Sequence, residues 1–171
     1  MENIILIGMP GCGKSTVGVV LAKNLGYRFI DSDLLIQERE DRLLHEIIEQ
    51  EGTEGFDEIE EEVNASIHTN RSVIATGGSV VYGPKAMEHL KGIGTLVYLR
   101  LPYEEISNRL GDLNARGVVL KKGQTLRDLY EERTPLYEKY ADMTVDAEGM
   151  ALREIVQYIR DHVYIKKKPG K

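Results

Sequence analysis

The segment GMPGCGKS, Gly8 to Ser15, constrains the fold more than any other part of the chain. It matches the pattern G-x-x-x-x-G-K-[S/T], follows the apolar run NIILI and precedes the helical pattern STVGVV. The glycines allow successive backbone N–H groups to turn inward and form a concave anion site at a helix N-terminus. The segment therefore predicts a strand, a phosphate-binding loop and a helix, in that order.

Four further apolar, β-branched runs predict strands: RFID from Arg28, SVIAT from Ser72, TLVYLRL from Thr95 and MTVDA from Met143. Their apolarity is continuous rather than alternating, which is typical of strands buried on both faces of a parallel sheet. Helical patterns fill the intervals, for example PKAMEHLKG, from Pro84 to Gly92. This alternation predicts one doubly wound α/β domain over residues 1–165.

Composition and charge exclude several classes of protein. The net charge of −6 argues against a nucleic-acid binder, which requires a basic face. No apolar run approaches the ~18 residues of a membrane span, and the N-terminus lacks the features of a signal peptide. The single cysteine excludes a disulfide framework and a cysteine zinc site. We expect a cytoplasmic monomer with a disordered basic tail at residues 166–171.

The loop predicts a nucleotide site for ATP and Mg²⁺. The Lys14 ammonium would reach the β- and γ-phosphates, and the Ser15 hydroxyl would ligate Mg²⁺. Cys12 is expected to be a small filler that contributes its backbone N–H, with a redox role as the alternative. The loop residues expected to hold the nucleotide are Gly11, Cys12, Gly13, Lys14, Ser15 and Thr16.

The remaining motifs favour a small-molecule kinase over other phosphate-binding enzymes. The GTPase string N-K-x-D is absent, and the strand SVIAT ends in Thr76 rather than in an acid. The acids DSD follow the second strand instead, where residues of a parallel sheet converge on a ligand. Asp31 would help to hold the Mg²⁺ water shell, and Asp33 would accept a hydroxyl proton. Asp33 also fits the N-cap position of the helix that follows, either instead of this role or in addition to it.

Residues 111–125, GDLNARGVVLKKGQT, interrupt the alternation of strands and helices. The segment has weak periodicity, three glycines and three basic residues. An irregular segment of this length inside a compact domain is typical of a lid over a site. We therefore expect a lid at about residues 111–124.

The motifs GMPGCGKST, FIDSD, GFDEIEEEV, ATGGSVV, NARGVVL and EERTPLYEKYAD are similar in order and spacing to those of shikimate kinase. The resemblance, within the nucleoside-monophosphate-kinase-like P-loop kinases, extends to about Arg160. It implies a five-stranded parallel sheet of order 2-3-1-4-5 flanked by helices, with acceptor-binding helices at about residues 34–70. It also implies transfer of the ATP γ-phosphate to shikimate, giving shikimate 3-phosphate in aromatic amino acid biosynthesis.

The resemblance assigns residues to the acceptor. Asp33 looks like the residue that binds the accepting hydroxyls and serves as base. Gly77 and Gly78 look like the start of a G-G-G turn that brings backbone close to the substrate. Arg133 matches an arginine that binds the substrate carboxylate, with pairing to acidic neighbours on its own helix as the alternative.

Two further arginines match family positions on the nucleotide side. Arg116 falls where the family has a lid arginine, which would stabilise charge on the transferred phosphoryl group. Arg109 matches a residue that packs against adenine, with a solvated helix position as the alternative. On this resemblance, the catalytic residues are Lys14, Asp33 and Arg116.

The chain departs from the family pattern on the acceptor side. The family motif G-E-x-x-F-R-x-x-E reads GTEGFDEIE here, so Asp57 occupies the arginine's position while Glu60 remains in register. Ser79 replaces the third glycine of the G-G-G turn. Two unit charges ~4 Å apart interact by ~4 kcal/mol at an effective dielectric of ~20, so this reversal opposes an anion. The other acids of this run are expected to form a solvated helix face: Glu58, Glu61 and Glu62.

Three functions remain open at this point. The first is a shikimate kinase with a rearranged carboxylate site. The second is a related kinase for another small polyol, amino sugar or hydroxy amino acid, whose amine Asp57 would accept. The third is a nucleotide-binding regulatory protein with weak transfer, against which the catalytic set argues. The residues expected to bind the acceptor are Asp33, Asp57, Gly77, Gly78, Ser79 and Arg133.

Overall fold

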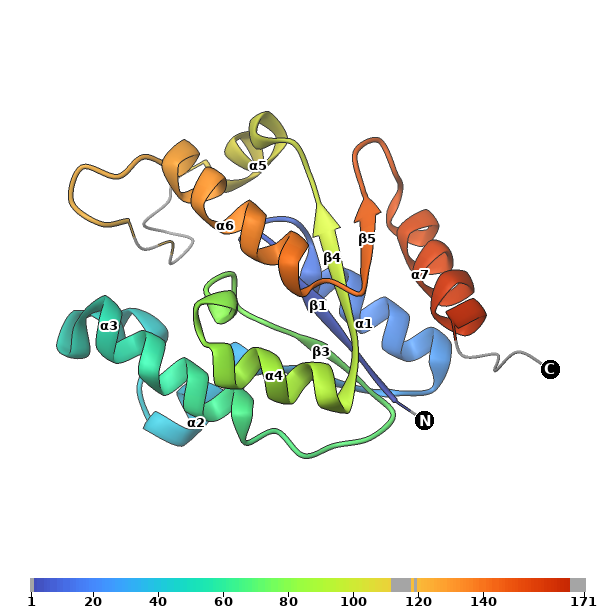
Figure 1. The fold of residues 1–171 in the computed structure, drawn as a ribbon, viewed down its shortest axis with the longest axis horizontal. Coiled ribbons are helices and arrows are strands. Elements are labelled where there is room, and N and C mark those ends of the chain that lie inside the picture. The colour runs from blue at the N-terminus through green and yellow to red at the C-terminus, as the bar shows by residue number, and fades with distance from the viewer. Residues whose placement is uncertain (1, 112–117, 119, 167–171) are drawn as a thin grey trace.

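The computed structural model describes residues 2–111, 118 and 120–166. The predicted lid and the predicted basic tail therefore lie partly outside the described residues. Five parallel strands form one sheet in the order β2-β3-β1-β4-β5, which confirms the predicted fold (Figure 1). The strands are β1 Asn3–Ile7, β2 Arg28–Asp31, β3 Ser72–Ala75, β4 Gly94–Arg100 and β5 Met143–Asp146.

Helices cover both faces of this sheet. Figure 1 shows α4 and α6 on one face and α1 on the other, where α1 contacts α7. The helices are α1 Lys14–Leu25, α2 Ser32–Glu40, α3 Leu44–Ala65, α4 Pro84–Ile93, α5 Tyr103–Leu110, α6 Leu126–Tyr140 and α7 Leu152–Lys166, with a 3-10 turn at Val80–Tyr82.

Strand β1 is the centre of the sheet, and every one of its residues is buried. It pairs in parallel with β3 on one side and β4 on the other, with Ile5 opposite both Ile74 and Leu96. A strand in this position has apolar neighbours above, below and on both sides, which explains its continuous rather than alternating apolar sequence. The carboxyl ends of the paired strands consequently meet at one edge of the sheet.

The helix boundaries follow local sequence signals with one small difference. Gly26 ends α1 in the left-handed conformation at φ 67°, as its position after the apolar pattern predicts. Helix α4 begins at Pro84, as predicted, but ends at Ile93 instead of Gly92. The helix continues past Gly92 because the chain turns only at Gly94, the first residue of β4.

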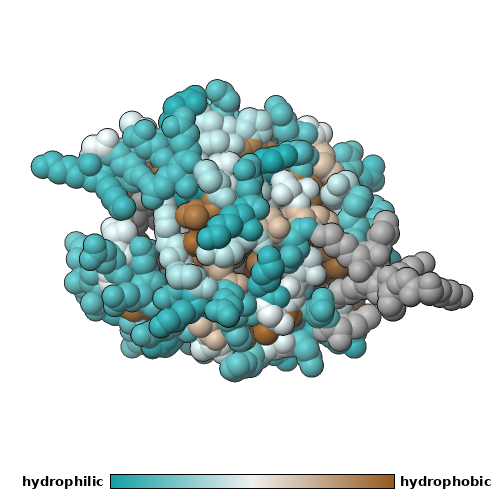
Figure 2. All heavy atoms as spheres, viewed as in Figure 1, coloured by the Kyte–Doolittle hydropathy of each residue, from teal (hydrophilic) through white to brown (hydrophobic). Residues whose placement is uncertain are grey.

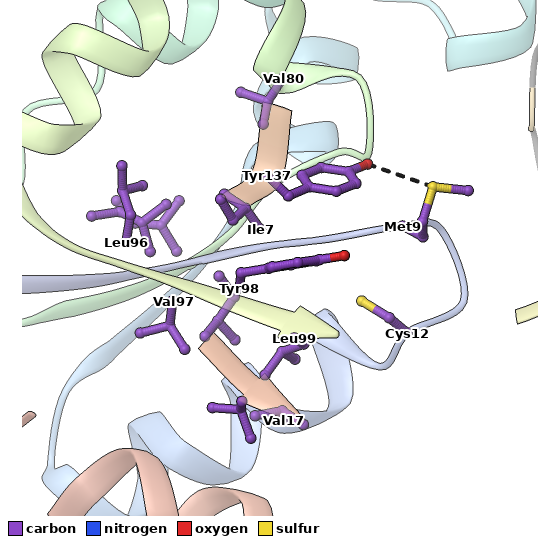
Figure 3. Close-up of a cluster of buried hydrophobic side chains, with 14 of the residues drawn as sticks. Ile7, Met9, Cys12, Val17, Val80, Leu96, Val97, Tyr98, Leu99 and Tyr137 are labelled. Atoms are coloured by element: carbon purple, nitrogen blue, oxygen red, sulfur yellow. Dashed lines mark hydrogen bonds between the residues drawn. The ribbon is translucent and has the colours of Figure 1, made fainter. Parts of the chain in front are cut away.

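The core contains a pair of stacked tyrosines that join α6 to the sheet (Figure 3). The rings of Tyr98 in β4 and Tyr137 in α6 stack with centroids 5.1 Å apart. The Tyr137 hydroxyl donates to the carbonyl oxygen of Gly78 at 2.6 Å and lies 3.8 Å from the Met9 sulfur. This contact fixes α6 against the loop after β1 and the turn after β3.

Helix α3 contains the segment GTEGFDEIE, from Gly52 to Glu60. The helix bends at Gly52, which has φ 73° and ψ 177°. Beyond the bend, Glu58 and Glu62 are exposed, as predicted. Glu61 differs from its prediction, because it is half-buried and its carboxylate accepts a hydrogen bond from the Lys85 N–H at the start of α4.

The surface is polar over most of the face in Figure 2, with small and separate hydrophobic areas. Within the described ranges, none of the helices combines the length and the apolarity needed to cross a membrane.

Replacing Asn3 by alanine should destabilise the protein strongly. The side chain is 1% exposed, donates to the carbonyl oxygens of Thr69 and Ile93, and accepts from the Ser72 N–H. Its loss leaves these buried backbone groups without partners, at about 1–3 kcal/mol for each unpaired group. Urea unfolding should show a free energy of unfolding at least ~2 kcal/mol lower.

The matched control is Asn24→Ala, which removes an exposed asparagine that makes one local hydrogen bond on α1. Its unfolding free energy should stay within about 0.5 kcal/mol of the wild type. Equal effects of the two substitutions would show that Asn3 does not tie the strands together.

Candidate active site

A cleft of about 790 Å³ lies at the carboxyl edge of the sheet. It is bounded by the loop after β1, the second half of α3, the turn after β3 and the segment before α6. Figure 2 shows a notch between α3 and the segment before α6. The predicted acceptor residues all line this cleft: Asp33, Asp57, Gly77, Gly78, Ser79 and Arg133.

The loop after β1 has the backbone conformation of an anion-binding loop. Gly8, Gly11 and Gly13 have φ values of 149°, 77° and 100°, which a residue with a side chain rarely adopts. The Lys14 ammonium donates to the carbonyl oxygens of Gly8 and Met9 at 2.7 and 2.9 Å. The positive charge is thus held at the mouth of the loop, where a phosphate oxygen can replace a carbonyl.

The loop residues predicted to hold the nucleotide divide into two groups. Cys12 does not line the cleft: its side chain is buried in the core (Figure 3), and its N–H donates to the Met9 carbonyl oxygen at 3.2 Å. Its expected role as a filler fits this position. The other predicted loop residues line the cleft: Gly11, Gly13, Lys14, Ser15 and Thr16.

Asp31 and Ser15 bring two oxygen ligands together beside the loop. The Ser15 hydroxyl lies 3.5 Å from a carboxylate oxygen of Asp31. The other Asp31 oxygen accepts from the Asp33 N–H at 2.9 Å, which makes Asp31 the N-cap of α2. The predicted N-cap role of Asp33 is therefore wrong, because Asp33 is already the second residue of the helix.

The carboxyl of Asp33 has a raised pKa. Burial and, to a smaller extent, the charge of Asp31 raise this pKa from 3.8 to about 6, and the charge of Lys14 opposes the shift. A carboxylate with this pKa is ionised at neutral pH and still accepts a proton readily. The side chain can therefore bind a hydroxyl group of a ligand and take its proton.

Gly77 and Gly78 allow the backbone to approach the side chains of the cleft. A Cβ atom on Gly77 would lie 2.8 Å from oxygens of both Asp33 and Glu60. A Cβ on Gly78 would lie 2.9 Å from a guanidinium nitrogen of Arg133. Any side chain here would displace the charged groups of the acceptor pocket, so glycine is required by close approach.

Glu60 is a buried acid whose carboxylate has one hydrogen-bond partner among the described residues. It is 2% exposed, and the Ser79 hydroxyl donates to its Oε1 at 2.6 Å. Its Oε2 has no hydrogen-bond partner among the described residues and faces the same point as an Asp33 oxygen. Burial raises the pKa of Glu60 to about 8, although the Ser79 hydrogen bond opposes this shift. Glu60 is therefore mostly protonated at neutral pH.

Arg133 is a buried cation that forms no ion pair with an acid in the described part of the chain. The residue is 7% exposed, and its Nε donates to the Tyr82 hydroxyl at 3.3 Å. Among the described residues, no carboxylate forms an ion pair with it, so the alternative of pairing within α6 is wrong. A buried guanidinium without a counter-ion is costly unless a ligand supplies one. The sequence analysis missed Tyr82, which no local pattern marks.

Asp57 faces the cleft instead of the solvent. It is half-buried, and burial raises the pKa of its carboxyl, while the charges of Arg133 and Lys121 lower it. The carboxyl of Asp57 is therefore placed where it can act on a ligand in the cleft.

The two remaining predicted residues have different outcomes. Arg109 lines the cleft and is exposed, with one nitrogen 3.4 Å from the Gly11 carbonyl oxygen and another paired with Glu105 at 2.7 Å. From this position, Arg109 can contact a nucleotide base bound over the loop after β1. Arg116 lies outside the described residues.

The comparisons with known proteins identify the family. The family model described as shikimate kinase matches residues 10–164. A shikimate kinase of Thermodesulfovibrio yellowstonii is 38% identical over 162 residues, which cover 93% of each chain. One from Thiobacillus denitrificans is 41% identical over 149 residues, covering 85% of this chain and 81% of the relative. The chain belongs to the shikimate kinase family.

Solved structures agree with this assignment. Shikimate kinase from Acinetobacter baumannii, in complex with shikimate, superposes with a TM-score of 0.89 at 34% identity, covering 99% of this chain and 96% of that one. Shikimate kinase from Aquifex aeolicus gives a TM-score of 0.82 at 31% identity, covering 98% and 99%.

Replacing Glu60 by glutamine should stabilise the protein at high pH. An unfolded glutamate loses its proton near 4.5 and native Glu60 near 8, so the native state binds more protons between these values. Stability is therefore lost as the pH rises through this window. The variant should gain at least about 1.4 kcal/mol relative to wild type between ~pH 4.5 and ~pH 9, the equivalent of one pKa unit.

Urea unfolding at several pH values measures this difference, with Glu58→Gln as the exposed control on the same helix. The control should follow the wild-type pH dependence. If Glu60→Gln does the same, Glu60 is ionised in the native protein.

Proposed function

We propose that this chain is an ATP-dependent kinase that phosphorylates a ring hydroxyl of shikimate, the activity of its family. Arg133 is the observation that carries the acceptor. Its buried guanidinium lines the cleft without an acidic partner among the described residues, and a carboxylate ligand would pair with it in a bidentate manner. The hydroxyl groups of the same ligand would lie toward Asp33. The acceptor must therefore carry both a carboxylate and a hydroxyl group.

The nucleotide would bind over the loop after β1. The backbone N–H groups at the start of α1 and the Lys14 ammonium would offset the phosphate charge. Asp33 would bind the accepting hydroxyl and take its proton as the oxygen attacks the γ-phosphorus and the bond to ADP breaks. Positioning of the two reactants supplies much of the rate in this class of reaction.

The residues beside the loop fit a magnesium ion. A hydroxyl from Ser15 and a carboxylate from Asp31, 3.5 Å apart, are the hard oxygen ligands that Mg²⁺ prefers alongside phosphates and water. We propose that these two residues hold Mg²⁺ directly or through water. When bound, the ion neutralises phosphate charge.

Two assignments rest on the resemblance to the family. Arg116 is proposed to stabilise the transferred phosphoryl group, and the segment 111–124 is proposed to exclude water as a lid. Arg109 is proposed to contact adenine, which its place on the cleft wall above the loop supports.

Turnover with shikimate tests the proposed function. The wild type should phosphorylate shikimate with kcat/KM of at least ~10⁴ M⁻¹s⁻¹, measured by ADP release and by phosphorus NMR of the product. Lys14→Met should lower kcat by at least ~10², because it removes a charge that stabilises the transferred phosphoryl group.

The same assay includes a neutral polyol, an amino sugar and a hydroxy amino acid. Faster turnover of one of these would assign the enzyme to that acceptor instead. Near-normal activity of Lys14→Met would contradict the proposed nucleotide site.

Replacing Asp57 by arginine should improve the use of shikimate. The substitution exchanges a repulsive charge for an attractive one on the wall of the cleft that holds Arg133. The KM for shikimate should fall at least ~10-fold, which corresponds to about 1.4 kcal/mol, with a smaller change in kcat.

Glu58→Arg is the matched control, because it makes the same charge reversal at an exposed position of α3 outside the cleft lining. It should leave the KM unchanged. An unchanged KM in Asp57→Arg as well would mean that the carboxylate of Asp57 does not act on the acceptor.

A further inference from the structure

Acids and bases both line the cleft, but the two buried cations among the described residues lie in different parts of it. Lys14 is held by the carbonyl oxygens of the loop after β1, whereas Arg133 acts on Asp57 on the acceptor side. Asp33, Asp57 and Glu132 line the cleft together with the largely neutral Glu60. A carboxylate ligand at Arg133 would therefore lie close to an acid instead of a second cation. The pocket needs another positive charge to hold such a ligand tightly.

Lys121 reaches this pocket from the segment before α6. It lines the cleft together with Asp57 and Arg133, and its side chain has no ion-pair partner within the described parts of the chain. A tight turn fixes its backbone: the Lys121 N–H donates to Gln124 Oε1 at 3.1 Å, and its carbonyl oxygen accepts from the Gln124 N–H at 2.9 Å.

A chain of hydrogen bonds connects this turn to Arg133. Gln124 Nε2 donates to one oxygen of Glu132 at 3.0 Å, and the Tyr82 hydroxyl donates to the other at 2.8 Å. The same hydroxyl accepts from Arg133 Nε at 3.3 Å. Lys121 and Arg133 are thus held on one scaffold, so that a ligand can meet both cations.

The charges of Lys121 and Arg133 already act on one carboxylate. Burial raises the pKa of Asp57, and both cations oppose that shift, which places both within electrostatic reach of the same point on the pocket wall. A ligand carboxylate beside Asp57 lies within the same reach.

We propose that Lys121 supplies the second cation of the acceptor-carboxylate site, in place of the arginine that Asp57 has replaced. This inference rests on the proposed function, because it requires an acceptor with a carboxylate. Arg133 holds the carboxylate from inside the pocket, and Lys121 approaches it from the rim.

Steady-state kinetics with shikimate test this assignment. Lys121→Ala should raise the KM about 10-fold, with kcat within about twofold of wild type, since the lysine binds the acceptor and does not touch the reacting atoms. Lys121→Arg should restore the wild-type KM. Lys122→Ala is the control, because Lys122 is exposed next to Lys121 and outside the cleft lining, and its KM should not change.

Two further measurements separate recognition of the carboxylate from a structural effect on the turn. With the methyl ester of shikimate as acceptor, Lys121→Ala and wild type should have equal KM values. In the Asp57→Arg background, Lys121→Ala should raise the KM for shikimate less than twofold, because the restored arginine supplies the second charge.

The outcomes distinguish this inference from the proposed function. Equal KM values for the wild type, Lys121→Ala and Lys122→Ala, in an enzyme that turns over shikimate, would overturn the role of Lys121 and leave the function intact. An equal loss with the methyl ester would also overturn it. A wild type that does not phosphorylate shikimate would overturn both.

Discussion

Parallel pairing of β1 with β3 and β4 is the constraint on which the rest of the site depends. It places the ends of three strands at one edge of the sheet, so the loop that follows β1 lies beside the turn that begins at Gly77. The buried amide of Asn3 secures the opposite end of these strands. Residues that are far apart in the sequence thereby line the same cleft.

Burial in this cleft changes the chemistry of its charged groups. Asp33 is partly desolvated and becomes a better proton acceptor than a free aspartate, whereas the deeper Glu60 keeps its proton at neutral pH. Oxygens of the two acids approach the same side of Gly77, yet the acids take different protonation states because Glu60 is more deeply buried and Lys14 lowers the pKa of Asp33. Arg133 cannot lose its charge, so it creates a strong preference for an anionic ligand.

The two sides of the cleft depend on different features of the chain. The loop from Gly8 to Ser15 keeps every position of its motif, and its geometry depends mainly on backbone. The acceptor side depends on side-chain charge, and there Asp57, Lys121 and Arg133 line the same cleft. The charges of Lys121 and Arg133, from two different segments, both act on the carboxyl of Asp57.

Sequence alone determined the five strands and the phosphate-binding loop, because periodicity and glycine spacing are local properties. The strand order came from the resemblance to the family. The place of Asp33 followed from its position directly after a parallel strand. Only the tertiary structure decided that Asp31, and not Asp33, caps α2, that Tyr82 contacts Arg133, and that Asp57 faces the cleft. The protonation state of Glu60 was also decided only by the tertiary structure. These features depend on burial and on distances between side chains from different elements, which the packing of the sheet and helices sets.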